Sequence, residues 1–294
     1  MVRLGDDGSD NFIDRTGRSG FGGGGGSSML GCLLPLIASR FGIGGIVVLL
    51  IGYFILTSIG GGGGILPGGA GPSQQAPAGQ SRLTAEDRRI LSGVLLSTEQ
   101  VWGALFRRAG QTYRPAEMVA YSNTDQSGCG VAQAALGPFY CPTDQRIYID
   151  PQFFNELSRR FGAPGDFAQA YVIAHEVGHH IQNLEGTLDR ASAAQARASR
   201  TEGNQIQVGV ELQADCYAGV WAANARDAQG SILEPGDLEE GMRAAEAIGD
   251  DTLQRQSQGR IVPESFTHGT AEQRMGALRR GLESGDPAAC NFAR

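Results

Sequence analysis

Three of the four histidines in this 294-residue chain lie in one stretch, AHEVGHHIQ, at positions 174–182. His175 and His179 are one helical turn apart, and Glu176 follows the first of them. On a helix both imidazoles point the same way, so two ring nitrogens can bind one metal ion at about 2.0–2.1 Å. This is the HExxH pattern, in which the glutamate does not bind zinc but takes a proton from a water that the zinc activates. We therefore predict a Zn²⁺ site with His175 and His179 as ligands and Glu176 as general base.

The residues around this motif favour the helix that the motif needs. Between Phe167 and Leu184, apolar residues recur at steps of three and four, which is typical of an amphipathic helix. Asp166 is suited to cap the start of this helix, and Gly186 is suited to cap its end. We therefore expect a helix over residues 165–186.

Gly178 and His180 belong to the same stretch but do not fit a ligand role. His180 projects about 100° away from His179 on a helix, so we expect it to pack against the fold or to support a ligand. Gly178 lowers helix stability relative to alanine. We infer that another segment approaches the helix backbone closely at Gly178.

A catalytic zinc site typically uses three protein ligands, so one more must come from elsewhere in the chain. The stretch VGVELQADCYAGVWAANA at 208–225 has the pattern of a second helix, with Glu211 and Asp215 one turn apart. Two carboxylates in an otherwise apolar helix are costly to bury unless they meet a cation. We predict Glu211 as the third ligand and Asp215 as the group that fixes the tautomer of a ligand histidine. The two roles could be exchanged, or the pair could form a partly solvated helix face.

Composition excludes some classes of protein. The formal net charge of −7 supplies no basic face for phosphate, so we expect no nucleic-acid partner. The 45 glycines are too many for a single folded domain, so part of the chain must be linker.

The first part of the chain has the pattern of a membrane anchor. Residues 41–59 are apolar and uncharged, and their number is enough to span a hydrocarbon core of roughly 30 Å. We expect a membrane segment at 29–59, with the spanning helix at about 41–59. A flexible Gly-rich tail at 1–28 would precede it, and an extended Gly/Pro linker at 60–81 would follow it.

The distribution of arginines predicts the orientation of this anchor in the membrane. Several precede the apolar run, and none follows it until Arg82. The positive-inside rule then places the N-terminus in the cytoplasm. We expect a single-pass protein of the cell membrane whose domain at 82–294 is extracytoplasmic, in the periplasm.

Four cysteines lie in the expected extracytoplasmic part, which suits an oxidising compartment and two disulfides. The short loop from Cys129 to Cys141 favours that pair, and Cys216 with Cys290 remains. A zinc cluster built from cysteines is the weaker interpretation, because no CxxC spacing occurs.

Short strands are expected before the motif. GVAQAALG at 130–137 and IYID at 147–150 have strand patterns on either side of the turn CPTDQ. The expected fold class is α+β, mostly helical, with a small antiparallel sheet beside the active-site helix. An edge strand there could pair with the backbone of an extended peptide. Residues 185–210 could form a helical insertion that covers the substrate, or a spacer.

The fourth histidine, His268, directly precedes a stretch with the pattern of a last helix. Thr270 and Gln273 have capping-box spacing at its start. A group just before a helix N-terminus lies where partial positive charge favours anions. His268 could therefore bind an anionic group, or it could serve as a structural cap.

Several blocks together resemble a known family. HEVGH followed by ELQAD resembles the glutamate-zincin pattern. The blocks SDNFIDRTGRSGFGGGGG, GCGVAQAALGPFYCPTDQRIYIDPQFF and FTHGTAEQRMGALRRGLESGDPAAC, in that order, resemble the bacterial neutral zinc metallopeptidases of the YpfJ type over nearly the whole chain. This resemblance implies a membrane-anchored, zinc-dependent peptidase with a zincin-like fold. It also implies that a late histidine donates to the oxyanion of the tetrahedral intermediate, a role for His268 or, as the weaker choice, Arg274.

The expected function is a membrane-anchored, zinc-dependent endopeptidase with Glu176 and His268 as catalytic residues. Its partner would be an extended peptide or an unfolded protein. Two alternatives remain at this point: an envelope scaffold that binds peptides and holds zinc only structurally, or a zinc amidase that cuts peptidoglycan cross-links.

Overall fold

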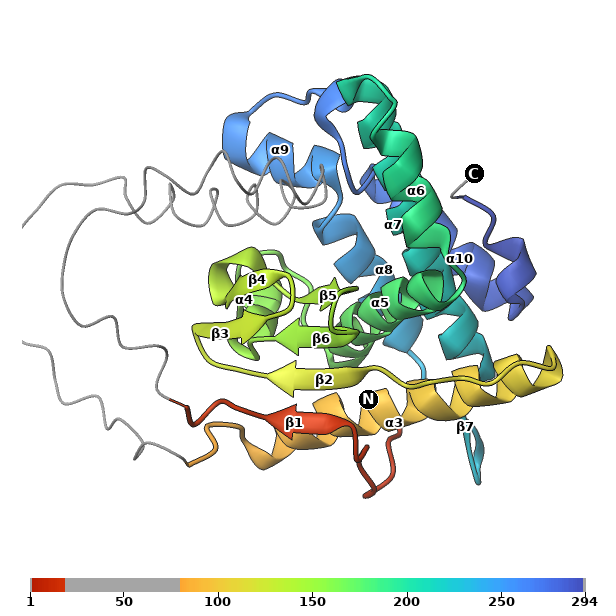
Figure 1. Ribbon diagram of the computed structural model, residues 1–294. Helices are drawn as coiled ribbons and strands as arrows, with labels where there is room; N and C mark the ends of the chain where they lie inside the picture. The colour runs from red at the N-terminus through yellow and green to blue at the C-terminus, as the bar shows by residue number, and fades with distance from the viewer. Residues whose placement is uncertain (1, 19–79, 293–294) are drawn as a thin grey trace, which may run out of the picture.

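The computed structural model describes residues 2–18 and 80–292, which form a mostly helical α+β fold with small sheets (Figure 1). The main sheet has the strand order β1-β2-β6-β5. Strand β5 is antiparallel to β6, whereas β1, β2 and β6 run parallel. The strands are β1 (Phe12–Asp14), β2 (Glu117–Ala120), β5 (Phe139–Cys141) and β6 (Arg146–Ile149).

Alternating side chains give the sheet two buried faces, as the two-residue period of a strand requires. In β2, Met118 and Ala120 point into the main core with the helices, and Val119 between them points to the other face. A hairpin of β3 (Thr124–Ser127) and β4 (Gly130–Gln133) supplies Ala132 to that second face.

The expected sheet differs from the observed one in its connections. Strand β4 lies within the predicted range 130–137, but it pairs with β3 in a separate two-stranded sheet. The strand that faces β6 across the turn is β5, which lies nearer to the turn. The expected small antiparallel sheet is in fact mixed. Strand β5 is antiparallel to β6, as expected, whereas β2 is parallel to β6, because the chain passes through β3, β4 and β5 between them.

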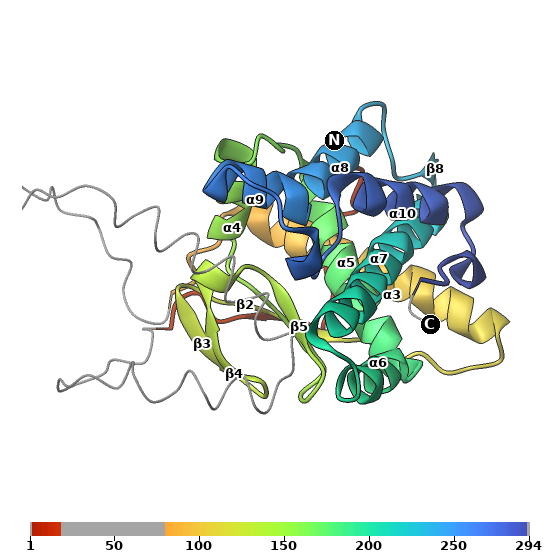
Figure 2. The ribbon, with the colours of Figure 1, turned by 90° about the horizontal axis from the view of Figure 1, so that it is seen from above.

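Helix α5 lies between the sheet and α7, so it is buried on most sides (Figure 2). Helix α10 packs along α7, and α3 runs under both the sheet and α5. The helices are α3 (Ala85–Arg108), α4 (Gln152–Arg159), α5 (Asp166–Leu184), α6 (Thr187–Gln195), α7 (Arg200–Asn224), α8 (Asp237–Ala247), α9 (Asp250–Gln258) and α10 (Ala271–Ser284).

Close helix packing explains Gly178. A Cβ at this position would lie 2.9 Å from the carbonyl oxygen of Ala214 on α7, so no larger residue fits. The inference of a close approach at Gly178 is confirmed. On the far side of α7, a Cβ on Gly281 would collide with the carbonyl oxygen of Cys216, which brings α10 equally close.

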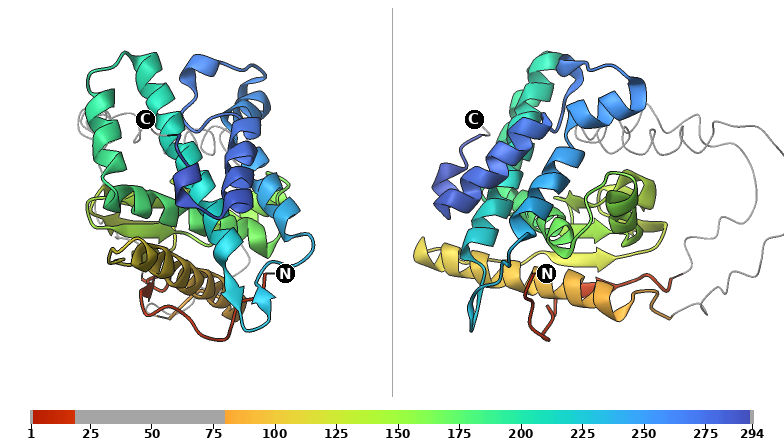
Figure 3. Two further views of the ribbon diagram at one scale, coloured as in Figure 1. Left: turned by 90° about the vertical axis from the view of Figure 1, so that its right-hand side faces the viewer. Right: turned by 180° about the vertical axis from the view of Figure 1, so that it is seen from behind.

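The region between the two predicted helices is itself helical. Helices α6 and α7 form an antiparallel hairpin (Figure 3). Gly186 makes the turn between α5 and α6 with a φ of 70°. Helix α7 begins at Arg200, earlier than expected, because Ser199 and Glu202 form a capping box there. Asp166 is the first residue of α5 and not its cap, which is Gly165.

Both expected disulfides are present. Cys129 bonds to Cys141 and ties the β3–β4 hairpin to β5, whereas Cys216 bonds to Cys290 and ties the end of the chain to α7. The capping box of Thr270 and Gln273 at the start of α10 is also confirmed.

The N-terminal residues differ most from the sequence-based expectation. Residues 2–18, which we assigned to a flexible tail, are part of the fold. Ile13 pairs with Val119 in the main sheet. Val2 is buried, and its backbone N–H donates to Asp166 Oδ2 at 2.7 Å. A segment that cannot fold alone can still bury its apolar residues against a domain that has folded.

This packing bears on the expected membrane topology. The predicted membrane segment at 29–59 and most of the linker at 60–81 lie outside the described residues. Within residues 2–18 and 80–292, no helix is both long and apolar enough to cross a membrane. A single crossing between residues 18 and 80 would place β1 and β2 on opposite sides of the bilayer, which is incompatible with their pairing.

We therefore expect residues 7 and 193 to face the same compartment. Both positions are exposed, so Asp7→Cys and Ala193→Cys can be compared in a Cys32→Ser background with a membrane-impermeant maleimide on intact cells. Both variants should be labelled, or neither should be, and both should react after permeabilisation. Labelling of only one in intact cells would contradict the β1–β2 pairing.

Candidate metal centre

Three potential metal ligands converge between α5 and α7. Glu211 Oε2 lies 3.3 Å from His175 Nε2 and 3.6 Å from His179 Nε2. One ligand atom from each of these residues lies within 4.8 Å of the other two. His175 and Glu211 are buried, and the His179 side chain is only 14% exposed. The sequence-predicted ligand set is thus brought together in space.

This arrangement fits zinc. Two atoms that each lie about 2.0–2.1 Å from a tetrahedral zinc ion are roughly 3.3–3.4 Å apart, close to the distances from Glu211 to the two histidines. Two imidazoles and one carboxylate are also a donor set that catalytic zinc uses. A second group of acidic side chains, Asp166, Asp237 and Glu240, offers only carboxylates and lacks the nitrogen or sulfur donors that zinc prefers.

The second nitrogen of His175 is held by Asp215. His175 Nδ1 lies 2.8 Å from Asp215 Oδ1. The same carboxylate accepts from Tyr171 Oη at 2.6 Å and from both Nε and Nη2 of Arg274. Asp215 is fully buried, so these bonds replace its lost hydration. Of the two roles considered for Glu211 and Asp215, the geometry matches the one in which Glu211 faces both histidines.

Arg274 does not lie where an oxyanion donor would. The residue is 2% exposed, and its guanidinium donates to Asp215, Tyr171 and the carbonyl oxygen of Ile248. These contacts favour a structural role for Arg274, because its charge is already paired with a carboxylate.

The second nitrogen of His179 has a neutral partner. His179 Nδ1 lies 2.8 Å from Oε1 of Gln182, one turn along α5. With their Nδ1 atoms engaged, both histidines turn Nε2 toward Glu211. Asp215 and Gln182 thus orient the two side chains.

Burial and charge set the protonation of these groups. Burial lowers the pKa of His175, but Asp215 and Glu211 outweigh burial and raise it to about 10. Burial likewise lowers the pKa of His179, and Glu211 raises it above its usual value. Burial raises the pKa of Glu211, yet the two histidines hold it well below its usual range. Both histidines thus favour the protonated form more than a free imidazole does, and Glu211 favours its charged form.

Glu176 is buried beside the ligands but is not one of them. Burial raises its pKa, and His175 and His179 partly oppose this shift. A hydrogen bond with the backbone of Tyr140 on β5 also stabilises its charged form. Glu176 therefore lies between the metal ligands and strand β5.

His180 on α5 hydrogen-bonds to the side chain of Tyr140 on that strand. Its Nδ1 lies 3.1 Å from Tyr140 Oη and its Nε2 lies 2.7 Å from the carbonyl oxygen of Arg114. Asn183 donates to the same tyrosine hydroxyl. The expected packing role of His180 matches these contacts, which hold β5 beside α5.

His268 approaches the ligands from a loop before α10. The loop packs on α7 on either side of Glu211, because a Cβ on Gly269 would touch Val208 and Leu212. The charge of His268 is close enough to lower the pKa of Glu211. His268 Nδ1 lies 3.1 Å from Asp250 Oδ1, and Asp250 also accepts the backbone N–H groups of Thr267 and His268.

Comparison with known proteins agrees with this donor set. The family model described as "Putative neutral zinc metallopeptidase" matches residues 1–292. The chain belongs to this zinc metallopeptidase family. It is 45% identical to the YpfJ protein of Escherichia coli K12 over 287 residues, 96% of this chain and 95% of that protein. It is 40% identical to Rv2575 of Mycobacterium tuberculosis H37Rv over 221 residues, 72% of this chain and 74% of that protein. No solved structure matches the chain.

The family implies zinc, and the site contains supporting residues that we did not single out in the sequence. Tyr171 and Gln182 lie on the same helix as the motif, at i−4 from His175 and i+3 from His179, where side chains meet. That spacing could have predicted that Tyr171 and Gln182 contact the two ligand histidines. Asp250 had no comparable signal, because its link to His268 depends on how α9 and the loop fold back.

Zinc binding should release at least one proton at pH 7, because zinc needs neutral imidazoles and the pKa of His175 is raised to about 10. Zinc affinity should therefore rise with pH as long as the pH lies below the pKa of His175. Calorimetric titration in two buffers with different ionisation enthalpies measures the number of protons. A binding heat that does not depend on the buffer would contradict the protonated state.

Proposed function

We propose that this chain is a zinc-dependent endopeptidase that hydrolyses peptide bonds with an activated water. The observation that carries this proposal is the convergence of His175, His179 and Glu211, with Glu176 buried next to them. Family membership supports a zinc peptidase at the coarser level. A site that held zinc only for stability would be closed by a fourth protein ligand, and among the described residues this group has three.

The bound zinc would act as a Lewis acid that polarises the scissile carbonyl and lowers the pKa of a water. Glu176 takes the proton from that attacking water. Its raised pKa makes it a better base than an exposed carboxylate, and lets it pass the proton on to the leaving amine.

His268 is proposed to stabilise the oxyanion. Asp250 holds Nδ1 and thereby turns Nε2 away from itself. In the imidazolium form, Nδ1–H donates to Asp250 and the N–H at Nε2 can donate to the negative oxygen that develops in the transition state, near Glu211. Asp250 thus orients His268 in the way that Asp215 orients His175.

The edge of β5 is the proposed binding surface for substrate. Among the described strands, β5 pairs only with β6, so no strand covers its other edge, which we propose binds an extended chain. The backbone of Tyr140 on β5 contacts Glu176, which places this edge next to the chemistry. Pairing through the backbone suits extended peptides or unfolded proteins and is insensitive to their side chains.

The proposed compartment is extracytoplasmic, in the periplasm. Two disulfides in the catalytic part favour an oxidising environment. The single-pass topology with a cytoplasmic N-terminus stays a prediction. The β1–β2 pairing instead favours a membrane attachment through residues 29–59 that leaves β1 in the same compartment as the metal centre.

Replacement of the general base tests the mechanism. We expect Glu176→Gln to lower peptide cleavage by about 10²–10⁴-fold while zinc content is unchanged, because the amide cannot accept the proton. The full chain in detergent is needed, since a fragment from residue 82 lacks β1. Cleavage of a mixed peptide library, measured by mass spectrometry, compares wild type, Glu176→Gln and the control Glu185→Gln.

Equal cleavage by wild type and Glu176→Gln would contradict the proposal. A zinc-loaded protein that cleaves no peptide but cleaves muropeptides would instead be an amidase. One that cleaves neither substrate, and whose phenotype survives Glu176→Gln, would be a scaffold.

Replacement of His268 tests the oxyanion role. His268→Ala should lower kcat by about 10²–10³-fold with little change in KM, because the lost bond forms mainly in the transition state. Zinc content measured by atomic absorption should stay at the wild-type level. Loss of zinc from His268→Ala would show that the residue binds the metal.

A further inference from the structure

The side-chain amide of Gln182 has a fixed orientation. Its Nε2 donates to the carbonyl oxygen of Val210 at 2.7 Å and to Gln213 Oε1 at 3.0 Å, so both of its N–H groups are used. Its Oε1 therefore faces His179 Nδ1 at 2.8 Å. Because an amide oxygen only accepts, Nδ1 must carry a proton, and the neutral ring then has its lone pair on Nε2. Nε2 is the nitrogen that faces Glu211.

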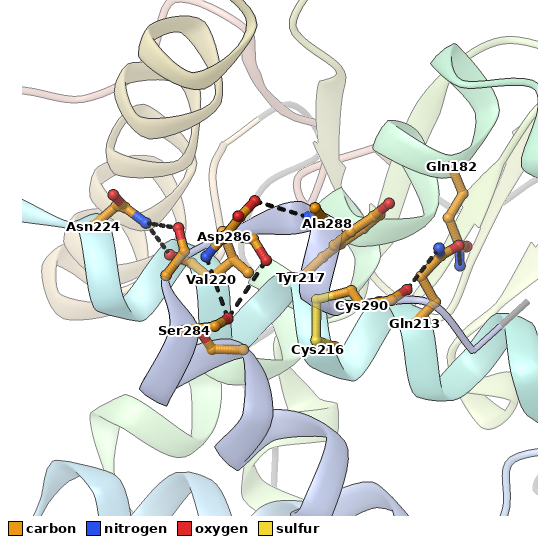
Figure 4. The surroundings of a disulfide bond; sticks show 12 residues. Gln182, Gln213, Cys216, Tyr217, Val220, Asn224, Ser284, Asp286, Ala288 and Cys290 are labelled. Carbon is orange, nitrogen blue, oxygen red and sulfur yellow. Dashed lines mark hydrogen bonds between the residues drawn. A yellow bond between two sulfur atoms is a disulfide. The ribbon is translucent and has the colours of Figure 1, made fainter. Parts of the chain in front are cut away.

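Gln213 is oriented from the other side. Its Nε2 donates to the carbonyl oxygen of Cys290 at 2.9 Å, which leaves Oε1 to accept from Gln182 (Figure 4). Backbone carbonyls cannot donate, so the direction of each bond is set by the main chain. We call the groups from the Cys290 carbonyl through Gln213 and Gln182 to His179 the glutamine relay.

The far end of the glutamine relay is fixed by a disulfide. Cys290 bonds to Cys216, which lies one turn after Gln213 on α7. Both cysteines are fully buried. Residues three apart on a helix are neighbours, so the disulfide places the Cys290 carbonyl beside the Gln213 amide (Figure 4).

We propose that Gln182 and Gln213 are positioning residues for the metal ligand His179, and that the Cys216–Cys290 disulfide completes their relay. This inference rests on the proposed zinc site. Without the Cys290 carbonyl, the Gln213 amide can turn over and point its N–H groups at Gln182. Gln182 Nε2 then keeps only the Val210 carbonyl as an acceptor, so the amide that orients His179 is held less firmly. A Gln182 amide that turns over would present an N–H to His179 Nδ1 and favour the neutral tautomer with its proton on Nε2, which cannot bind zinc.

The dissociation constant for zinc alone, measured by competition with a fluorescent chelator on the full chain in detergent, tests the relay. Gln182→Met and Gln213→Met should each weaken binding about 10–100-fold, as loss of such supporting partners does. The double variant should be no weaker than Gln182→Met alone, because both changes break one relay. The matched control is Gln254→Met, a glutamine bonded to Val262 and Ser265 outside the relay.

A rescue variant separates positioning from packing. In Gln182→Glu the carboxylate still accepts from His179 Nδ1 but no longer donates to Val210 and Gln213, so part of the zinc affinity lost in Gln182→Met should return. If Gln182 only filled space, the buried charge would make Gln182→Glu worse than Gln182→Met. Thermal unfolding of each metal-free variant reports general destabilisation separately.

The two disulfides provide a second comparison. Cys216→Ala with Cys290→Ala should weaken zinc binding, whereas Cys129→Ala with Cys141→Ala should not, because the latter pair lies outside the relay. In a Gln213→Met background, removal of Cys216–Cys290 should cause no further loss of affinity.

Unchanged affinity in Gln213→Met, or equal losses in Gln182→Glu and Gln182→Met, would overturn the relay. If Gln182→Met does not fold, Gln213→Met decides, because it leaves the partner of His179 in place. Failure of the wild-type chain to bind zinc would overturn the proposed function and the relay together. Unaffected variants of a zinc-binding wild type would overturn only the relay.

Discussion

The packing of the central helices depends on one buried carboxylate, that of Asp215. An ionised carboxylate without partners is too costly to bury, and Asp215 on α7 is fully buried. Its partners are Tyr171 and His175 on α5 and Arg274 on α10, so three helices must meet at this point. Burial raises the pKa of Asp215, but Arg274 and His175 lower it to about 2. Removal of one partner from such a buried pair typically costs roughly 3–5 kcal/mol. Helix packing and the orientation of a metal ligand therefore depend on the same bonds.

Local sequence patterns were sufficient for the parts of the site that lie within single helices. The spacing of His175 and His179, and the apolar period around them, predicted α5 within two residues at each end. The start of α7 was missed because residues 200–207 are mostly polar and lack that period; only the Ser199 capping box marks it. Helical spacing predicts which residues share a face. The free-energy cost of burying the Glu211 carboxylate without a cation then predicts that it meets the metal bound by the two histidines.

Contacts that join distant segments could not be predicted in the same way. Strand β1 is three residues long and forms only by pairing with β2, more than a hundred positions away. Composition correctly indicates that residues 2–18 cannot fold alone, but it does not exclude their docking on a folded domain. The Asp250–His268 pair and the glutamine relay depend in turn on how α9 and the end of the chain fold back onto α7. In each case the side chains carry no local sequence pattern that marks them, and the way the chain folds back determines their partners.

The charges around the ligands explain why the two histidines have different supports. Asp215 needs Arg274, and the two charges cancel, so the support of His175 adds no net charge. Gln182, which supports His179, is neutral. Two carboxylates then remain, Glu211 and Glu176, and the two charges of one zinc ion would balance them when both are ionised. A neutral amide therefore orients His179 without adding a buried charge that the zinc ion would not balance.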